Sequence, residues 1–241
     1  MPDLRDKVVL VTGAASGLGE AIAAQAVAAH ARVVMIDRQS ERLQDAVKKL
    51  PADAAERVLA LEADLLDRDR LEEVLTEVES RWGVLDVLVN NAGTDVTASM
   101  QSLSIEDWDR VIATNLSAPF VLSKMALPML IERRGQIVNI ASTAALRAWP
   151  NASAYHASKW GVRGLSHALH AELREVGVRV MCVVAGGMRT PFLLDRFEGL
   201  DLSRLQEPAN VAKVILMAIS TPRGSAIPEL MVLPEQESSW P

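Results

Sequence analysis

An apolar run leads straight into a glycine-rich turn in Val8-Val9-Leu10-Val11-Thr12-Gly13-Ala14-Ala15-Ser16-Gly17-Leu18-Gly19. The apolar residues predict a buried strand, and the residues after the turn predict a helix that reaches Ala29. At such a junction the backbone N–H groups and the helix dipole can bind the pyrophosphate of a dinucleotide. The spacing GxxxGxG differs from the common GxGxxG fingerprint, and glycine turns alone are often structural. The strand–turn–helix context is what favours a nucleotide site here.

The rest of the chain continues this alternation of strands and helices. Further strands are expected at 32–36, 58–61, 84–89, 136–140, around Cys182 and at 230–233, with helices at 41–50, 67–82, 105–133, around Tyr155 and at 211–219. Near-continuous apolar strands separated by helices predict a doubly wound α/β fold, a parallel sheet of about seven strands with helices on both faces. We expect one domain over residues 1–241. The segment from 186 to 208 lacks periodicity, and we expect it to form a substrate lid near 187–208.

Composition narrows the class of protein. The 241 residues carry a net charge of −6 and no basic stripe, which argues against nucleic acid as a partner. The single cysteine, Cys182, lies in an apolar run, so we expect it to be buried and the protein to work in a reducing compartment. The N-terminal residues lack a signal-peptide core, and no apolar stretch has the length that crosses a bilayer. A cytoplasmic protein without a membrane partner is the expectation.

Tyr155 and Lys159 are four residues apart, with Ser142 thirteen residues upstream of the tyrosine. This spacing puts the phenol and the ammonium on one face of a helix. A free tyrosine has a pKa of about 10, and a neighbouring cation lowers that pKa. Reaching a pKa of roughly 7 takes about 4 kcal/mol, which one close ammonium at low dielectric could largely supply. Such pairs are common on helix surfaces, so their meaning depends on the other motifs.

Asp37 follows the second predicted strand, where a carboxylate would accept hydrogen bonds from the adenosine ribose. A carboxylate there repels the 2′-phosphate of NADP. Arg38 is suited to a phosphate, whereas Ser16 is neutral where a basic residue would help to bind one. We favour NAD over NADP on this balance.

With these motifs in place, the chain resembles the short-chain dehydrogenase/reductase family in its compact single-domain form, which has a Rossmann fold. The resemblance rests on the glycine turn, Asp64-Leu65, the run from Asn90 to Gly93, Asn115, Ser142 and the Tyr155/Lys159 pair. It implies that Tyr155 is the acid/base, that Lys159 lowers its pKa and binds the nicotinamide ribose, that Ser142 holds the substrate oxygen, and that Asn115 holds a relay water. The implied cofactor contacts are Gly13, Ser16, Gly17, Leu18, Gly19, Asp37, Arg38, Asp64, Leu65, Asn91, Ala92, Gly93, Tyr155, Lys159, Gly186, Met188 and Thr190.

The function implied by the resemblance is hydride transfer between NAD, or less favourably NADP, and a secondary alcohol or ketone. The alternative is a non-catalytic NAD(H) sensor or scaffold, in which the tetrad is usually eroded. An epimerase or dehydratase would need a longer chain with an added domain. The resemblance also implies a homotetramer or homodimer. We expect no metal, because His167 and His170 have no second cluster beside them and read as a solvated or interface face.

Three features depart from the family pattern. The C-terminal segment Ile227–Pro234 lacks the frequent acidic-Gly-Gly ending and looks more like the branch that acts on small hydroxy acids and hydroxy amino acids. Ala185-Gly186-Gly187 stands where the family usually has Pro-Gly, and the more permissive residues predict a looser backbone beside the pocket. His30 replaces the glycine expected after the first helix. Because histidine tolerates positive φ, we expect the fold to accept it.

Overall fold

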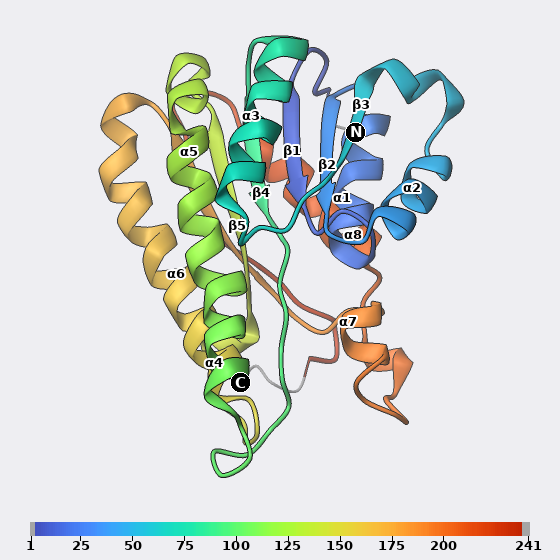
Figure 1. The fold of residues 1–241 in the computed structure, drawn as a ribbon, viewed down its shortest axis with the longest axis vertical. Coiled ribbons are helices and arrows are strands. Elements are labelled where there is room, and N and C mark those ends of the chain that lie inside the picture. The colour runs from blue at the N-terminus through green and yellow to red at the C-terminus, as the bar shows by residue number, and fades with distance from the viewer. Residues whose placement is uncertain (1–2, 238–241) are drawn as a thin grey trace.

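Seven parallel strands form one sheet in the order β3-β2-β1-β4-β5-β6-β7. The computed structural model describes residues 3–237, so the remaining residues of the predicted domain, 1, 2 and 238–241, lie outside it. The strands are β1 Val8–Thr12, β2 Arg32–Asp37, β3 Val58–Glu62, β4 Val87–Asn90, β5 Gln136–Ser142, β6 Arg179–Ala185 and β7 Glu229–Val232. The predicted doubly wound fold is confirmed (Figure 1).

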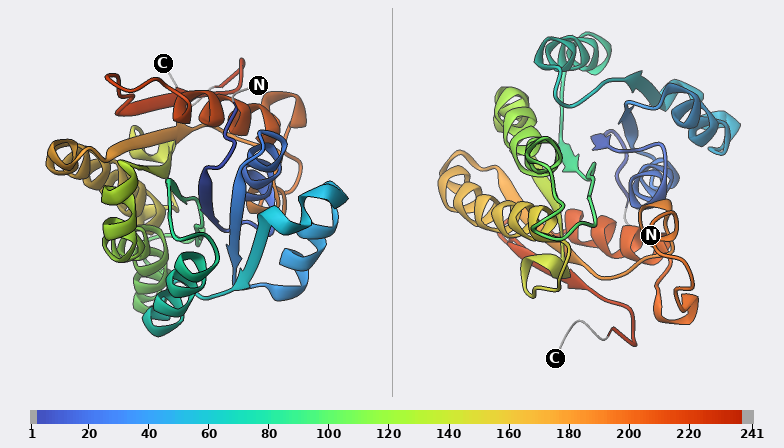
Figure 2. Two further views of the ribbon diagram at one scale, coloured as in Figure 1. Left: turned by 90° about the horizontal axis from the view of Figure 1, so that it is seen from above. Right: turned by 60° about the horizontal axis from the view of Figure 1, so that its bottom comes forward.

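Helices cover both faces of the sheet (Figure 2). One face carries α1 Gly17–Ala28, α2 Ser40–Lys48 and α8 Pro208–Ile219, and the other carries α3 Arg68–Trp82, α5 Ala118–Arg133 and α6 Ser153–Leu173. Successive strand residues alternate between these layers: Val9 and Val11 pack on the first, Val8 and Leu10 on the second. The strands read as continuous apolar runs because both of their faces are buried.

The strand order reverses between β1 and β4, where chain connections leave the sheet in opposite directions. In open α/β sheets, ligands bind in the crevice at the carboxyl ends of the strands at this switch point. The helices α4 Ile105–Ile112 and α7 Pro191–Leu194 lie toward this end, at the bottom of Figure 1, and Figure 2 (right) brings it forward.

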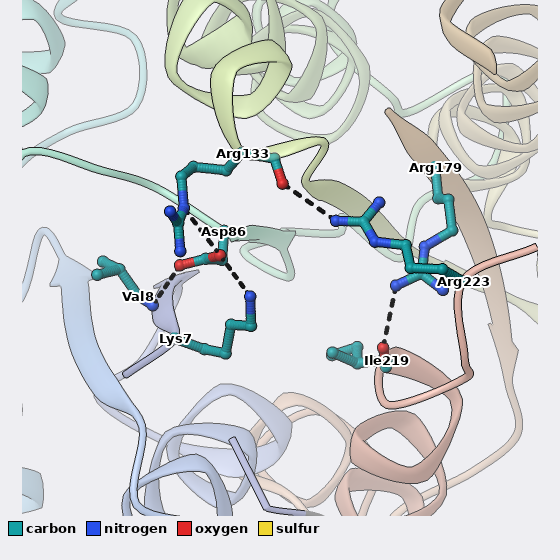
Figure 3. Close-up of polar contacts among 7 residues, drawn as sticks. All are labelled: Lys7, Val8, Asp86, Arg133, Arg179, Ile219 and Arg223. Atoms are coloured by element: carbon teal, nitrogen blue, oxygen red, sulfur yellow. Dashed lines mark hydrogen bonds and ion pairs between the residues drawn. The ribbon is translucent and has the colours of Figure 1, made fainter. Parts of the chain in front are cut away.

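The fourth strand begins at Val87, three residues later than the predicted start at Val84. Asp86 stands before it as a buried carboxylate that accepts hydrogen bonds from Val8 N at 3.0 Å, Lys7 Nζ at 2.9 Å and Arg133 Nε at 3.3 Å (Figure 3). The buried charge needs these partners, which are found at the amino edge of the sheet and not inside it. Asp86 therefore fastens α5 to β1 at the end opposite to the switch point.

The same edge holds two arginines that cap helices (Figure 3). Arg179 donates to the carbonyl of Ile219 at the end of α8, and Arg223 donates to the carbonyl of Arg133 at the end of α5. Cations are favourable at helix carboxyl ends, where carbonyl groups lack intrahelical partners. These contacts are structural and lie far from the crevice.

The long helix predicted over 105–133 contains a π-helical turn at Ala113–Ser117, between α4 and α5. Ala118 N donates to the carbonyl of Ala113, five residues back. The turn adds one residue to the helical repeat, so it changes which way Asn115 points. A periodicity argument cannot detect a change of one residue between two apolar helices.

Two expectations about single residues are confirmed. His30 follows α1 with φ of 65°, in the left-handed region that the replaced glycine would occupy. Cys182 is fully buried in β6.

Candidate active site

The glycine turn after β1 leaves room for a ligand and none for side chains. Gly13 has φ of 65°, and a Cβ atom there would lie 2.8 Å from Ala92 Cα. A Cβ atom at Gly19 would overlap the carbonyl oxygen of Gly13, so this glycine lets α1 approach the turn. Ser16 precedes α1 without a side-chain cap bond, so its side chain satisfies none of the first-turn N–H groups of α1. This arrangement fits the pyrophosphate of a dinucleotide.

Thr12 and Asn91 lock the turn to the end of β4. The Thr12 hydroxyl accepts hydrogen bonds from Asn91 N and Ala92 N, both at 3.0 Å. Asn91 Nδ2 donates to the carbonyl of Thr12 at 2.9 Å. The Asn91 side chain therefore holds the turn in place through this hydrogen bond. Thr12 is a positioning residue that sequence reasoning missed, although a hydroxyl residue at the end of the strand was a signal.

One cavity of about 880 Å³ runs from the end of β2 past the glycine turn to the lid segment. The predicted site residues that line it are Gly13, Ser16, Gly17, Leu18, Asp37, Arg38, Asp64, Leu65, Asn91, Ala92, Gly93, Ser142, Tyr155, Lys159, Gly186, Met188 and Thr190. Gly19 and Asn115 do not line it. Leu205, within the predicted lid, also lines it, as do Gln236 and Glu237, which were not predicted.

The adenosine end of the cavity is built around two carboxylates. Asp37 accepts hydrogen bonds from Ala15 N at 3.2 Å and from Gln39 N at 3.0 Å. Asp64 accepts from Leu66 N at 2.9 Å. These backbone contacts fix the carboxylates on the cavity wall, with Arg38 beside them. A fixed acceptor at the end of β2 is suited to ribose hydroxyls.

Tyr155 and Lys159 lie at the other end of the cavity, one turn apart on α6, beside Ser142 at the end of β5. The Lys159 ammonium lies 5.7 Å from the centre of the Tyr155 ring. It donates a hydrogen bond to the carbonyl of Ile140 at 2.8 Å. The structure therefore brings together the three side chains that the sequence analysis singled out.

The electrostatics of this pair differ from the sequence expectation. Burial raises the pKa of Tyr155, the Ser142 hydroxyl lowers it, the Asp95 carboxylate raises it and Arg196 lowers it, and together these effects raise the pKa to about 12. Burial also lowers the pKa of Lys159 to about 8. The predicted lowering of the tyrosine pKa is wrong for the protein by itself, because desolvation favours the neutral form of both groups. Residue spacing gave no measure of burial.

Asn115 lies behind the cavity wall and is 1% exposed. Its side chain accepts from Thr94 N and donates to Thr94 O, both at 2.8 Å, and donates to Ser158 Oγ at 3.0 Å. Ser158 Oγ in turn donates to the carbonyl of Tyr155. Asn115 thus ties the loop after β4 to the helix that carries the tyrosine. The relay role implied by the family stays a prediction.

His156 is buried and holds the loop after Ser142. Its Nδ1 lies 2.9 Å from the carbonyl of Ala144, and its Nε2 lies 3.1 Å from Trp149 N. Because Trp149 N can only donate, Nε2 accepts and the proton is on Nδ1. The imidazole ring also packs edge-on against the Trp149 ring, with centroids 4.3 Å apart. Its partners lie in a loop, so no spacing pattern predicts them.

Gly186 and Gly187 are closely packed, which differs from the predicted loose backbone. A Cβ atom at Gly186 would lie 2.6 Å from both Pro234 Cδ and Glu237 Oε2. One at Gly187 would lie 2.8 Å from Leu205 Cδ2. The missing side chains make room for the segment 234–237 and for the lid, so these residues form part of the cavity wall.

The lid segment is anchored to the turn. Thr190, which precedes α7, is buried and lies 3.2 Å from the place where a Cβ atom of Gly17 would be. The ring of Phe192 lies 5.7 Å from the ring of Tyr155. The lid therefore covers the tyrosine end of the cavity.

Known proteins resemble this chain over nearly its whole length. The family described as short chain dehydrogenase matches residues 7–200. A 3-oxoacyl-[acyl-carrier-protein] reductase of Thermotoga maritima is 37% identical over 229 residues, which are 90% of this chain and 92% of the relative. A metagenomic short-chain oxidoreductase solved with NADP is 33% identical with a TM-score of 0.83, covering 95% of this chain and 98% of its own. The closed form of serine dehydrogenase with NADP⁺ is 30% identical with a TM-score of 0.86, covering 96% of each chain.

Proposed function

The chain belongs to the short-chain dehydrogenase family, an oxidoreductase family, and from this premise we propose that it interconverts a secondary alcohol and a ketone. The observation that carries the proposal is the meeting of Ser142, Tyr155 and Lys159 at one end of a cavity whose other end fits a dinucleotide. A bound nicotinamide supplies hydride transfer to or from the substrate carbon. The side chains of this protein transfer the proton of the substrate hydroxyl group.

Tyr155 is the proposed acid/base, taking the hydroxyl proton in the oxidation direction and returning it in the reduction direction. Ser142 donates a hydrogen bond to the substrate oxygen and keeps it next to the phenol. Lys159 lies close enough to stabilise the phenolate by its charge. Asn115, held between Thr94 and Ser158, is proposed to keep the relay water near Lys159.

NAD is the proposed cofactor, and the support for it is the Asp37 carboxylate at the end of β2, held by Ala15 N and Gln39 N, which would repel a 2′-phosphate. The two similar structures named above hold NADP, so the identity of the nucleotide depends on this chain's own residues. Arg38 lines the same end of the cavity and would favour a phosphate. The carboxylate is the better placed of the two, since two backbone groups orient it.

We further propose a cytoplasmic homotetramer or homodimer that pairs through α5 and α6. Phe120 on α5 and Trp160 on α6 are each 49% exposed, which suits an interface. Sedimentation that gives a monomer at micromolar concentration would contradict this. Among residues 3–237 no helix is long and apolar enough to cross a bilayer.

The test is a screen of secondary alcohols with NAD and with NADP, followed by Tyr155→Phe. We expect cofactor reduction with at least one alcohol and a loss of about 1,000-fold in kcat for the variant. Full activity in Tyr155→Phe would refute the assignment of the base. Tight NAD(H) binding with no turnover on any alcohol would favour the alternative, a sensor or scaffold.

A further inference from the structure

An ion pair lies at the tyrosine end of the cavity, in a place that the catalytic assignment does not use. Arg196, in the lid, approaches Asp95, in the loop after β4, with Nη1 and Oδ2 2.9 Å apart. Both residues line the cavity, and their side chains are 22% and 8% exposed. Charged groups this deeply placed are costly unless they are fully paired.

The arginine is held in a defined orientation close to the reacting centre. Arg196 Nε donates to the carbonyl of Phe192 at 2.7 Å, and the guanidinium lies 3.7 Å from the centre of the Phe192 ring. That ring lies against the ring of Tyr155. One aromatic ring therefore separates the guanidinium from the phenol.

The pair leaves polar atoms unsatisfied. Among the described residues, Asp95 Oδ1 and Arg196 Nη2 are buried without a hydrogen-bond partner, and Nη1 has the carboxylate alone beside it. A purely structural pair would be expected to satisfy these atoms internally. The atoms without a partner are a donor on the arginine and an acceptor on the aspartate, in two paired residues that line one cavity.

A group that fills both positions must accept from the guanidinium and donate to the carboxylate. We propose that Arg196 binds the carboxylate of the substrate and that Asp95 accepts from an ammonium or hydroxyl group beside it, so that the substrate is a compact hydroxy acid. This inference rests on the proposed alcohol oxidation and specifies its substrate. Phe192 lies close to both Arg196 and Tyr155, which favours a short acid. Its carboxylate can then reach the guanidinium of Arg196 while the hydroxyl group to be oxidised reaches the phenol of Tyr155. Guanidinium and carboxylate form strong paired hydrogen bonds, which makes the contact selective.

A second reading is that the pair only fastens the lid. The lid has another ion pair that serves as a matched control, Arg189 with Glu207 at 2.7 Å, and Arg189 does not line the cavity. If fastening were the whole role of Arg196, Arg189→Gln and Arg196→Gln would have similar effects on every substrate.

The experiment compares each acid with its neutral ester. 3-Hydroxybutyrate, threonine and their methyl esters, as all stereoisomers, are assayed with the wild type, Arg196→Gln, Asp95→Asn and Arg189→Gln. We expect kcat/KM for the acids to fall about 50-fold in Arg196→Gln while the values for the esters change less than about 3-fold. Asp95→Asn is expected to impair threonine more than 3-hydroxybutyrate. Arg189→Gln is expected to leave the preference for acids unchanged.

A binding measurement separates this inference from the proposed reaction. Acetoacetate and methyl acetoacetate are titrated calorimetrically into protein saturated with oxidised cofactor, where no reduction can occur. We expect acetoacetate to bind, and its affinity to fall in Arg196→Gln, even if no alcohol is turned over. The inference is overturned if kcat/KM and affinity fall equally for the acid and for its ester in Arg196→Gln. It is also overturned if the wild type shows no preference for the acid. Absence of turnover with arginine-dependent binding would refute the proposed reaction alone.

Discussion

Lys159 directs its ammonium to the carbonyl of Ile140, 2.8 Å away, while it lies buried in the cavity wall beside Tyr155. When the protein folds, the charged ammonium gives up the water around it and gains this carbonyl as a hydrogen-bond acceptor. The buried lysine therefore lowers the stability of the fold, as groups in functional sites often do.

We predict that Lys159→Met stabilises the cofactor-free protein at pH 7. Lowering the lysine pKa from 10.5 to about 8 corresponds to about 3 kcal/mol, of which the lost bond to Ile140 offsets about 1 kcal/mol. The folded wild type binds fewer protons than the unfolded chain between pH 8 and 10.5, so its stability rises in that window. The advantage of the variant should shrink there. Urea unfolding at pH 7, 8.5 and 10 tests this, and an advantage that does not depend on pH would contradict it.

The protonation state of Tyr155 can be measured directly, because it is the only tyrosine in the chain. We predict that tyrosinate absorbance develops with a midpoint near pH 12 in the protein alone, since burial raises the pKa to about 12. Saturating NAD⁺ should move the midpoint lower, because a nearby positive charge favours the phenolate. Tyr155→Phe supplies the blank. A midpoint near 7 without cofactor would show that Lys159 alone lowers the pKa.

Asp37→Ser should move the preference from NAD toward NADP. The change removes a carboxylate that repels the 2′-phosphate and leaves Arg38 to attract it. We expect the ratio of kcat/KM for NAD to that for NADP to fall by about 100-fold, corresponding to about 3 kcal/mol. Arg38→Ala is the opposing variant and should raise the ratio. An unchanged ratio in Asp37→Ser would place the discriminating contact elsewhere.

His156→Phe should destabilise the loop that follows Ser142. It leaves Trp149 N and the carbonyl of Ala144 without their partner, which costs about 2 kcal/mol. We expect kcat to fall more than KM rises, because the loop positions the serine. Chemical denaturation and steady-state kinetics test both parts. His30→Gly, a histidine far from the cavity in a left-handed position, is the control and should not lower kcat.

The sequence predicts the strands well where apolar runs are buried on both faces, as in β1 and β2. It places the start of β4 too early because Val84 and Leu85 are apolar, whereas the strand begins at Val87, directly after the buried carboxylate of Asp86. The π-helical turn at Asn115 escapes prediction since it changes the helical phase by a single residue.

For the site, local motifs bring 17 of the 19 predicted residues to the cavity wall, because a turn, a strand end and a helix each carry their own signal, but they do not identify neighbours such as Ile36, Gln39 and Ala63. The properties that depend on tertiary packing were not predictable. Burial reverses the pKa shift of Tyr155, and the pairing of Asp95 with Arg196 joins two loops that are far apart in the chain. Residue types and spacing thus predict which side chains meet, whereas burial and contacts between distant loops do not follow from them.

The packing of Gly186 against Pro234 and Glu237 has a consequence for how the site is made during synthesis. A ribosome delivers the glycine turn and Tyr155 long before it delivers residues 234–237. A nascent chain that has only its first 190 residues outside the exit tunnel can order most of the sheet, yet the wall beside Gly186 is still missing. We therefore expect a chain that lacks residues 234–237 to bind a dinucleotide more weakly than a chain that has this wall.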